Sequence, residues 1–358
     1  MGELQAKEAL DKIIKKSRVH LYKPIQIAEI LYQKRVNGPI NLLNLESYRN
    51  ISKKWRDDIT IQLVGRKSTS SARYQDDVFN ESAMPPKLLD VLGKENNKNN
   101  GVVEAYIYSH FSMKLSEISK VIDYVRTTPV SEFDLIHLFQ CFRENQVLRR
   151  SIDKIYEIVV YSLFDTLITK MEAKITLSVA CNKKYLIEEF EDFAKLVLGV
   201  DKNNLEYITD ASINRIGVTN AADRGLDMWA NSGPAIQVKH LTLDLSLARE
   251  ITGNIASDKI IIVCRDYESD VIKSIISQLG LNIQGIIKES QLDSWYRRAL
   301  HGKYAGEIAQ LLIDSIIEQL LEEFPSQSRN TFAELFTSRG YDKIKLNGIW
   351  EKRNFKQN

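Results

Sequence analysis

Three polar side chains between residues 224 and 244 are of types that can bind a metal ion and activate water. Asp227, Gln237 and Lys239 occur in the stretch RGLDMWANSGPAIQVKHLTLD. The Asp227 carboxylate can bind a hard divalent cation such as Mg²⁺, and the Gln237 amide oxygen and the Val238 carbonyl are weaker, neutral ligands. A lysine can orient an attacking water and stabilise charge that develops on a phosphate. These residue types together favour metal-dependent hydrolysis of a phosphodiester bond.

The three side chains share one face only if two strands pair in one register. Residues i and i+2 of a strand point the same way, so Gln237 and Lys239 share a face while Val238 points toward a core. A three-residue loop at 231–233 places Asp227 opposite Gln237, whereas loops of two or four residues would turn Asp227 to the other face. Gly233 suits the left-handed position of such a loop, and Pro234 suits the first residue of a strand.

The elements that must position this hairpin predict an α/β (α+β) protein with two parts. Residues 1–180 are expected to be a mainly helical region, with helices over 4–35 and 41–59, a strand over 59–65 and further helices over 103–180. Residues 181–358 are expected to be the catalytic domain with C-terminal helices and a basic tail. A helix over 187–199 is predicted to point Phe190, Phe193, Ala194 and Val197 inward. Strands are then expected at 206–209 or 213–218, 225–230, 235–242, 259–264 and 281–287, with helices between the later ones.

This order of elements resembles the PD-(D/E)xK nuclease superfamily in its QxK variant, whose core runs αβββαβ. The resemblance implies that Asp227 and Gln237 hold the metal, that Lys239 assists the nucleophilic water, and that a helical acidic residue completes the site. Glu188, Glu189 and Glu191 are the alternatives for that residue, and Glu191, directly after Phe190, is preferred. The chain departs from the pattern in having Leu226 before the aspartate, and the neutral Gln237 leaves one anionic ligand fewer.

Simpler interpretations of the same residues exist. An aspartate beside a hairpin is most often a turn cap, and a lysine on a strand often serves solubility. His240 follows Lys239, but strand alternation puts it on the opposite face, so it is expected to be structural. The order of strands and helices around the motif favours the nuclease interpretation.

A basic segment precedes this region in a nearly neutral chain. Residues 49–73 resemble a helix-turn-helix segment, and its exposed side chains are expected to hold phosphates or read bases. A solvated helix face is the alternative. The predicted DNA-binding residues are Arg49, Lys53, Lys54, Arg56, Arg66, Lys67, Ser70 and Arg73. Further basic residues with interleaved aromatics occur at 296–303 and from 338 to the C-terminus.

Three stretches of the N-terminal sequence are more specific for one protein family than the catalytic motif is. The stretches HLYKPIQIAEILYQKR, LLNLESYRNISKKWRDDITIQLVGRKSTSSARYQDDVF and NNGVVEAYIY resemble the HaeII-type group of type II restriction endonucleases. The resemblance implies a homodimer that cuts both strands of double-stranded DNA with Mg²⁺ at a palindromic GC-rich site of the form purine-GCGC-pyrimidine. It assigns DNA recognition and dimerisation to the helical region over residues 1–180. It also implies a cognate DNA methyltransferase that acts on the same site without having to bind this chain.

Composition excludes several other classes. The 358 residues are 44% hydrophobic and 27% charged with a net charge of +2, which is globular and neither disordered nor collagen-like. Cys141, Cys181 and Cys264 are widely spaced and predict reduced thiols. With no apolar run long enough for a bilayer and no signal core, the chain is expected to be cytoplasmic in a prokaryote, with no membrane partner.

Three alternative functions stay open on the residues alone. A methyl-directed or repair nuclease would use the same core. A sequence-specific DNA-binding protein with an inactive core would account for the neutral Gln237. A structural helical protein with an incidental hairpin is the third.

Overall fold

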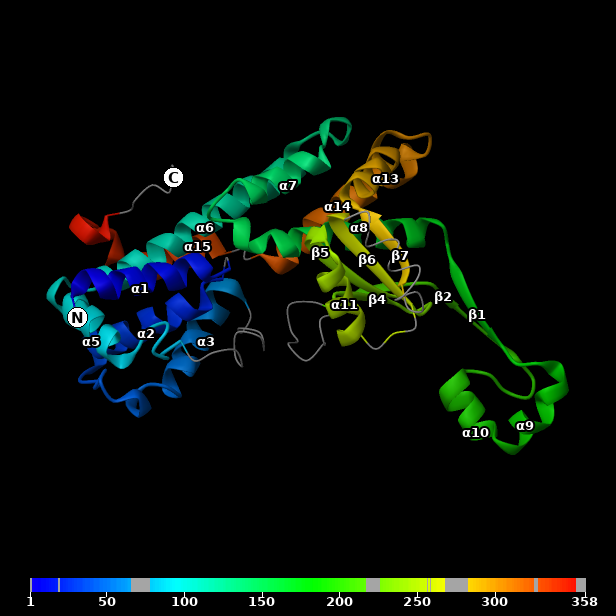
Figure 1. Cartoon of the computed structure of the whole chain (residues 1–358), viewed down its shortest axis with the longest axis horizontal. Helices are drawn as coiled ribbons and strands as arrows, with labels where there is room; N and C mark the ends of the chain where they lie inside the picture. The colour runs from blue at the N-terminus through cyan, green and yellow to red at the C-terminus, as the bar shows by residue number, and fades with distance from the viewer. Residues whose placement is uncertain are drawn as a thin grey trace. The chain divides into compact units, whose positions relative to one another are not determined.

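The computed structural model describes residues 2–18, 20–65, 78–216, 226–255, 257, 259–267, 283–324 and 328–351. The chain forms two compact units (Figure 1). The first contains the described residues of 1–158 and 316–358, and the second those of 159–216 and 223–315. Helices α8 (Ile152–Lys170) and α14 (Ala305–Glu323) each continue from one unit into the other. Within the described residues, no helix has both the length and the apolar character to cross a membrane.

The first unit is helical, as predicted, and is built around one long helix. Helix α6 begins after Gly101 and is buried continuously from Val102 to Phe111, which is typical of a helix with neighbours on all sides. The apolar side chains of the surrounding helices form one core with it. The helices that belong wholly to this unit are α1 (Glu3–Lys16), α2 (Tyr22–Asn37), α3 (Ile51–Val64), α5 (Pro86–Lys98), α6 (Val102–Thr127), α7 (Leu135–Arg143) and α15 (Ser328–Ser338).

The predicted strand over residues 59–65 is wrong, because helix α3 continues to Val64. Its buried residues recur at helical spacing, at Ser52, Arg56, Thr60 and Leu63, and the helix packs against α2. Gly65 ends it in the left-handed conformation, with its N–H donating to the carbonyl of Ile61 at 2.8 Å. The β-branched residues of this stretch favour a strand locally, but tertiary packing overrides that preference.

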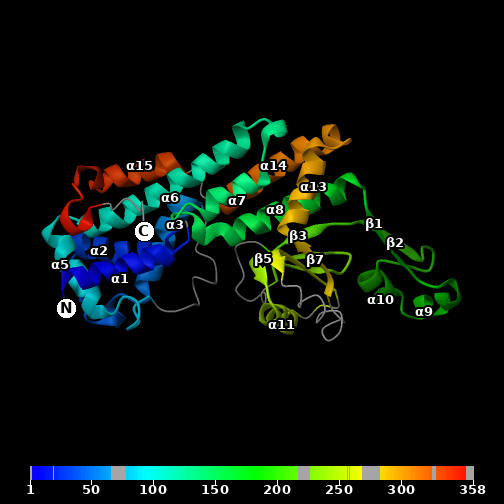
Figure 2. The ribbon, with the colours of Figure 1, turned by 45° about the horizontal axis from the view of Figure 1, so that its top comes forward.

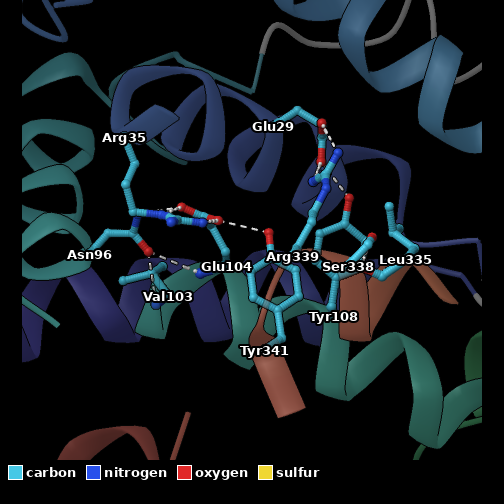
Figure 3. A network of polar contacts seen from close by, with 10 residues as sticks. All are labelled: Glu29, Arg35, Asn96, Val103, Glu104, Tyr108, Leu335, Ser338, Arg339 and Tyr341. Carbon is cyan, nitrogen blue, oxygen red and sulfur yellow. Dashed lines mark hydrogen bonds and ion pairs between the residues drawn. The ribbon is translucent and has the colours of Figure 1, made fainter. Parts of the chain in front are cut away.

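A buried network of charges joins the two ends of the chain in the first unit (Figure 3). The Arg339 guanidinium donates to both carboxylate oxygens of Glu29, at 2.6 and 3.0 Å, and Glu29 is 1% exposed. Glu104 is fully buried and accepts hydrogen bonds from Arg35 and from Tyr341. Burial, and then the Glu104 carboxylate, raise the pKa of Tyr341 well above its usual value, so its hydroxyl remains a donor.

This network gives a physical reason for the division of the chain. The predicted boundary near residue 180 assigned the C-terminal helices and tail to the catalytic domain, but residues after 316 belong to the same compact unit as the N-terminal helices. Helix α15 and the turn Tyr341–Lys343 pack against α6. Tyr341 and Trp350, which the sequence suggested as part of a basic tail, are buried in this core.

The described part of the second unit contains a five-stranded mixed sheet in the order β3-β4-β5-β6-β7. Strands β3, β5 and β7 of this sheet are labelled in Figure 2. Strands β3, β4 and β5 pair in antiparallel fashion, and β5 also begins a parallel part with β6 and β7. Side chains of β5, β6 and α11 form a common core. The bounds are β3 (Ile213–Arg215), β4 (Met228–Ala230), β5 (Ala235–Leu243), α11 (Leu245–Asn254), β6 (Ile260–Tyr267), β7 (Ile283–Lys288) and α13 (Glu289–His301). Most of the helix predicted over 266–279 lies outside the described residues.

The predicted register of the central hairpin is confirmed. Met228 pairs with Ile236, and Trp229 pairs with Ala235. Continued by one residue, this register places Asp227 opposite Gln237. Three residues close the turn, since the N–H of Ala230 donates to the carbonyl of Pro234 at 2.9 Å. Gly233 has φ +116°, a conformation that other residues adopt only with strain.

A long hairpin precedes the sheet and carries a small helical lobe (Figure 1). Strands β1 (Lys174–Ser178) and β2 (Glu206–Asp210) pair in antiparallel fashion, and we call residues 174–210 the arm and residues 179–205 the tip lobe. The predicted continuous helix over 187–199 is wrong. The structure has α9 (Lys184–Glu189), α10 (Glu191–Phe193) and a π-helical turn (Ala194–Leu198) instead.

The predicted inward face of that helix is also mostly wrong. Ala194 is buried, but Phe190, Phe193 and Val197 are each more than half exposed. An apolar stripe shows which side of a helix avoids water, and does not show that the same chain covers it.

The Arg339–Glu29 pair predicts a large loss of stability on removal of one partner. Arg339→Met leaves the Glu29 carboxylate buried without its cation, and we expect the free energy of unfolding of the first unit to fall by about 3–5 kcal/mol. Lys120→Met is the control within the same unit, because Lys120 is 68% exposed where it pairs with Glu117 and its loss should cost about 0–1 kcal/mol. Urea unfolding followed by circular dichroism measures both, and equal losses would contradict a structural role for the buried pair.

Candidate active site and DNA-binding residues

Asp227 is fixed in place by the strand opposite it. It directly precedes β4, and its Oδ2 accepts a hydrogen bond from the N–H of Val238 at 2.8 Å. The Gln237 amide nitrogen donates to the same oxygen. Both donors exist only in the register found here, so the hairpin itself sets the orientation of the carboxylate.

Gln237 and Lys239 lie on the adjoining strand, as the sequence predicted. Gln237 is 2% exposed, and its carboxamide oxygen has no hydrogen-bond partner among the residues that the structure describes. Lys239, two residues on, is half-buried and shares the face of Gln237. Ile236 and Val238 are buried on the opposite face, which is also the face of His240.

The oxygen atoms at this place fit a hard divalent cation, though with little negative charge. Asp227 supplies one carboxylate, and the unpaired Gln237 oxygen is a buried acceptor that lacks a donor. Mg²⁺ is commonly held by one or two carboxylates while water and substrate phosphate fill the remaining positions. Within the described residues, no three His, Cys, Asp or Glu side chains gather as a metal-binding group.

Glu191 is not brought to this site. It lies in the tip lobe, where its carboxylate pairs with Lys195 at 2.9 Å and with Lys202 at 3.9 Å. The Lys195 ammonium, followed by that of Lys202, lowers the pKa of Glu191 from its usual value. Glu188 and Glu189 are exposed on the same lobe. The choice of Glu191 depended on its place directly after Phe190, which was expected to point inward from a helix over 187–199. Phe190 is exposed instead, and that helix is broken there.

The predicted DNA-binding segment divides into exposed and buried residues. Lys53 and Lys54 are exposed on α3, and Arg49 is half-buried beside Glu46. Arg56 lies inside the protein instead of on the exposed face, because its guanidinium donates to Asp57 at 2.7 Å and to Gln26 at 3.3 Å. Arg56 is therefore removed from the predicted set. The other predicted residues lie outside the described part of the chain: Arg66, Lys67, Ser70 and Arg73.

The second basic set is also only partly exposed. Tyr296 is buried, and its hydroxyl donates to the carbonyl of Val159 at 2.8 Å. Arg298, His301 and Lys303 are exposed at the end of α13 and just beyond it.

A charge pair at the ends of β6 and β7 was not among the predicted site residues. Parallel pairing places Lys239, Cys264 and Lys288 in one row across the sheet. Lys288 Nζ lies 2.9 Å from Asp266 and 3.7 Å from the centre of the Tyr267 ring. Burial, and then the Asp266 carboxylate, raise the pKa of the Cys264 thiol to about 11, so Cys264 is a neutral core residue. Charged residues directly after two apolar runs were the signal that could have revealed Asp266 and Lys288.

Comparison with known proteins gives consistent matches over nearly the whole chain. The family model for the HaeII restriction endonuclease matches residues 6–341. The type II restriction enzyme HaeII of Haemophilus aegyptius is 49% identical over 346 residues, which cover 96% of this chain and 98% of that protein. The type II restriction enzyme NgoBI of Neisseria gonorrhoeae is 48% identical over 346 residues, which cover 96% of this chain and 98% of that protein. No solved structure matches the chain.

These matches extend across both compact units, from the N-terminal helices through the Asp227 hairpin to Tyr341 at the edge of the first core. The chain therefore belongs to the HaeII restriction endonuclease family, whose members are type II site-specific deoxyribonucleases.

Proposed function

We propose that the chain hydrolyses phosphodiester bonds in both strands of double-stranded DNA with Mg²⁺, at a palindromic GC-rich site. The observation that carries the catalytic assignment is the pairing of Asp227 with Gln237, which puts Asp227, Gln237 and Lys239 on one face of the sheet. The same order and spacing of residues occur in PD-(D/E)xK nucleases of the QxK variant. By likeness to the family, the DNA sequence that the chain recognises would have the form purine-GCGC-pyrimidine.

The roles follow from the chemistry of each group. Asp227, oriented by the Val238 N–H, would hold the metal together with the Gln237 amide oxygen and the Val238 carbonyl. A bound Mg²⁺ would polarise the phosphate and lower the pKa of a water molecule. The Lys239 ammonium would orient the attacking water and stabilise the negative charge that develops on the phosphate. Because each chain carries one such site and DNA has two strands, the active form would be a homodimer.

A cognate DNA methyltransferase would protect the same DNA sequence inside the cell, without having to bind this chain. The neutral Gln237 is the observation that favours the second candidate function, a DNA-binding protein whose nuclease core is inactive.

Cleavage of unmethylated phage or plasmid DNA tests the proposed function directly. We expect discrete fragments that require Mg²⁺, and we expect Lys239→Ala to slow cleavage by about 100-fold or more because charge stabilisation at the phosphate is lost. Lys259→Ala is the matched control, since Lys259 is an exposed lysine of the same unit, just before β6. A smear in place of fragments would indicate a repair or nonspecific nuclease. Intact DNA together with tight binding would favour the inactive core.

The charge of residue 237 predicts how strongly the site holds metal. Gln237→Glu adds a second carboxylate next to Asp227, so without metal the two charges repel and the melting temperature should fall. The second carboxylate should also raise the affinity for Mg²⁺. The Mg²⁺ concentration that gives half of the metal-induced rise in melting temperature should therefore be roughly tenfold lower for Gln237→Glu than for the wild-type chain. Gln291→Glu, an exposed change on α13, controls for added charge. If Mg²⁺ shifts both variants equally, Gln237 does not face a metal.

The exposed lysines of α3 predict a salt-dependent contribution to DNA binding. The double variant Lys53→Gln, Lys54→Gln should weaken binding at every DNA sequence and reduce the slope of log affinity against log salt by about 2, one unit per lost phosphate contact. Lys94→Gln with Lys120→Gln removes the same charge from exposed positions elsewhere in the first unit. Fluorescence anisotropy without Mg²⁺ measures both variants. Equal slopes of log affinity against log salt in the two double variants would show that the lysines of α3 contribute to DNA binding only through net charge.

A further inference from the structure

The tip lobe of the arm exposes large apolar side chains at its surface. Between 44% and 86% of each of the following is exposed: Tyr185, Leu186, Phe190, Phe193, Leu196 and Val197. Single exposed apolar residues are ordinary, but six within thirteen successive positions are a concentration that marks a contact surface.

The lobe has little core of its own to offset this exposure. Only Ile187, Ala194 and Val200 are fully buried in its apolar cluster. Its helices α9 and α10 are short, and short helices in water gain most of their stability from packing. A lobe of this size therefore places more apolar surface outside than inside, which favours a partner that covers it.

We propose that the tip lobe is the surface through which two copies of this chain associate. This inference rests on the proposed function, because a homodimer would offer one copy of the site to each strand of the DNA. The structure also links the lobe's hairpin to the active-site hairpin. Asn231, in the turn between β4 and β5, accepts from the N–H of Ser212 at 2.8 Å and donates to the carbonyl of Asp210 at 2.9 Å.

The exposed area agrees with what a stable dimer needs. Together with Tyr207 and Ile208 on β2, the exposed fractions of the lobe's apolar residues amount to roughly four to five complete side chains. At about 150–200 Å² for each side chain, the arm offers on the order of 700–900 Å² of apolar surface. A stable protein interface buries about 800 Å² on each partner, which is close to this total.

The charge of the arm favours a second copy over DNA. Residues 174–210 contain five lysines against seven aspartates and glutamates, so the arm is acidic and would be repelled by phosphates. Both signs are exposed beside the apolar residues, with Lys183 and Lys184 at the start of α9 and Glu188 and Glu189 at its end. A two-fold interface brings the same surface of both copies together, so a patch with both signs can complement itself.

The experiment measures the mass of the full chain in solution without DNA or metal. By light scattering after gel filtration, and by sedimentation, we expect a species of about twice the 41.1 kDa of one chain. Leu196→Glu should raise the dissociation constant of the dimer by about 100-fold, because an unpaired carboxylate would be buried at the contact. Leu196 is 86% exposed in the isolated chain, so the substitution should leave folding unchanged, and circular dichroism checks this.

Two further variants make the test specific. Leu4→Glu is the matched control, since Leu4 is 59% exposed on α1 and should leave the dimer intact. Phe193→Ser removes apolar area without adding charge and should weaken the dimer less than Leu196→Glu. The proposal is overturned by a wild-type chain that is monomeric at all concentrations, or by an unchanged mass in Leu196→Glu. Unchanged mass with lost DNA binding would assign the lobe to DNA instead.

The mass measurement is independent of cleavage. A dimer that dissociates in Leu196→Glu would support the tip lobe as an interface even if no DNA were cut. Cutting by a wild-type monomer would contradict both the interface and the homodimer, and would leave the proposed hydrolysis of DNA standing.

Discussion

The pairing of β4 with β5 is the constraint on which the rest of the second unit depends. A strand that slips by one residue turns every side chain to the other face. In the observed register Asp227 lies beside Gln237, and a shift of one residue would turn it to the face of Ile236 and Val238. The three-residue turn with Gly233 at φ +116° holds that register. From β5 the chain crosses by α11 to β6, and the parallel pairing of β5, β6 and β7 places Lys239 in a row with Cys264 and Lys288. The arm is joined to the same turn through Asn231.

Two clusters of buried polar groups, the Glu29 and Glu104 network of the first unit and the Asp227 hairpin of the second, differ in whether each buried oxygen has a hydrogen-bond donor. In the first unit, Glu29 and Glu104 are nearly inaccessible, and each carboxylate is matched by a guanidinium and a tyrosine hydroxyl. Such a network holds the C-terminal segment against the N-terminal helices. In the second unit, the buried oxygen of Gln237 has no donor among the described residues. A folded protein rarely leaves a buried acceptor unpaired without a ligand or water to meet it, and here the acceptor lies beside a carboxylate.

Local chemistry explains which features could be predicted from the sequence. The hairpin register depended on Gly233, Pro234 and strand alternation, all within a few residues, and the structure confirms it. The strand expected at 59–65 failed because the packing of Thr60 and Leu63 beside α2 outweighs β-propensity. Arg56 was expected at a DNA surface, but its partner Gln26 lies thirty residues earlier, and no local pattern shows such a pairing.

The break of the 187–199 helix at Phe190 is a failure of the same kind. An amphipathic pattern cannot tell a core within one chain from a contact between two chains.

A single carboxylate at the proposed metal site has a consequence for how the site would work. A second acid beside Asp227 would be repelled by it in the absence of metal, because two carboxylates at hydrogen-bond distance cannot both stay ionised without cost. Gln237 avoids that repulsion and donates a hydrogen bond to Asp227 instead, so the hairpin is stable with no ion bound. The remaining negative charge that Mg²⁺ requires would then come from the phosphate of DNA. In the proposed site, Asp227 and Gln237 would thus hold metal well only when substrate is present, and this ties the assembly of the reactive centre to DNA binding.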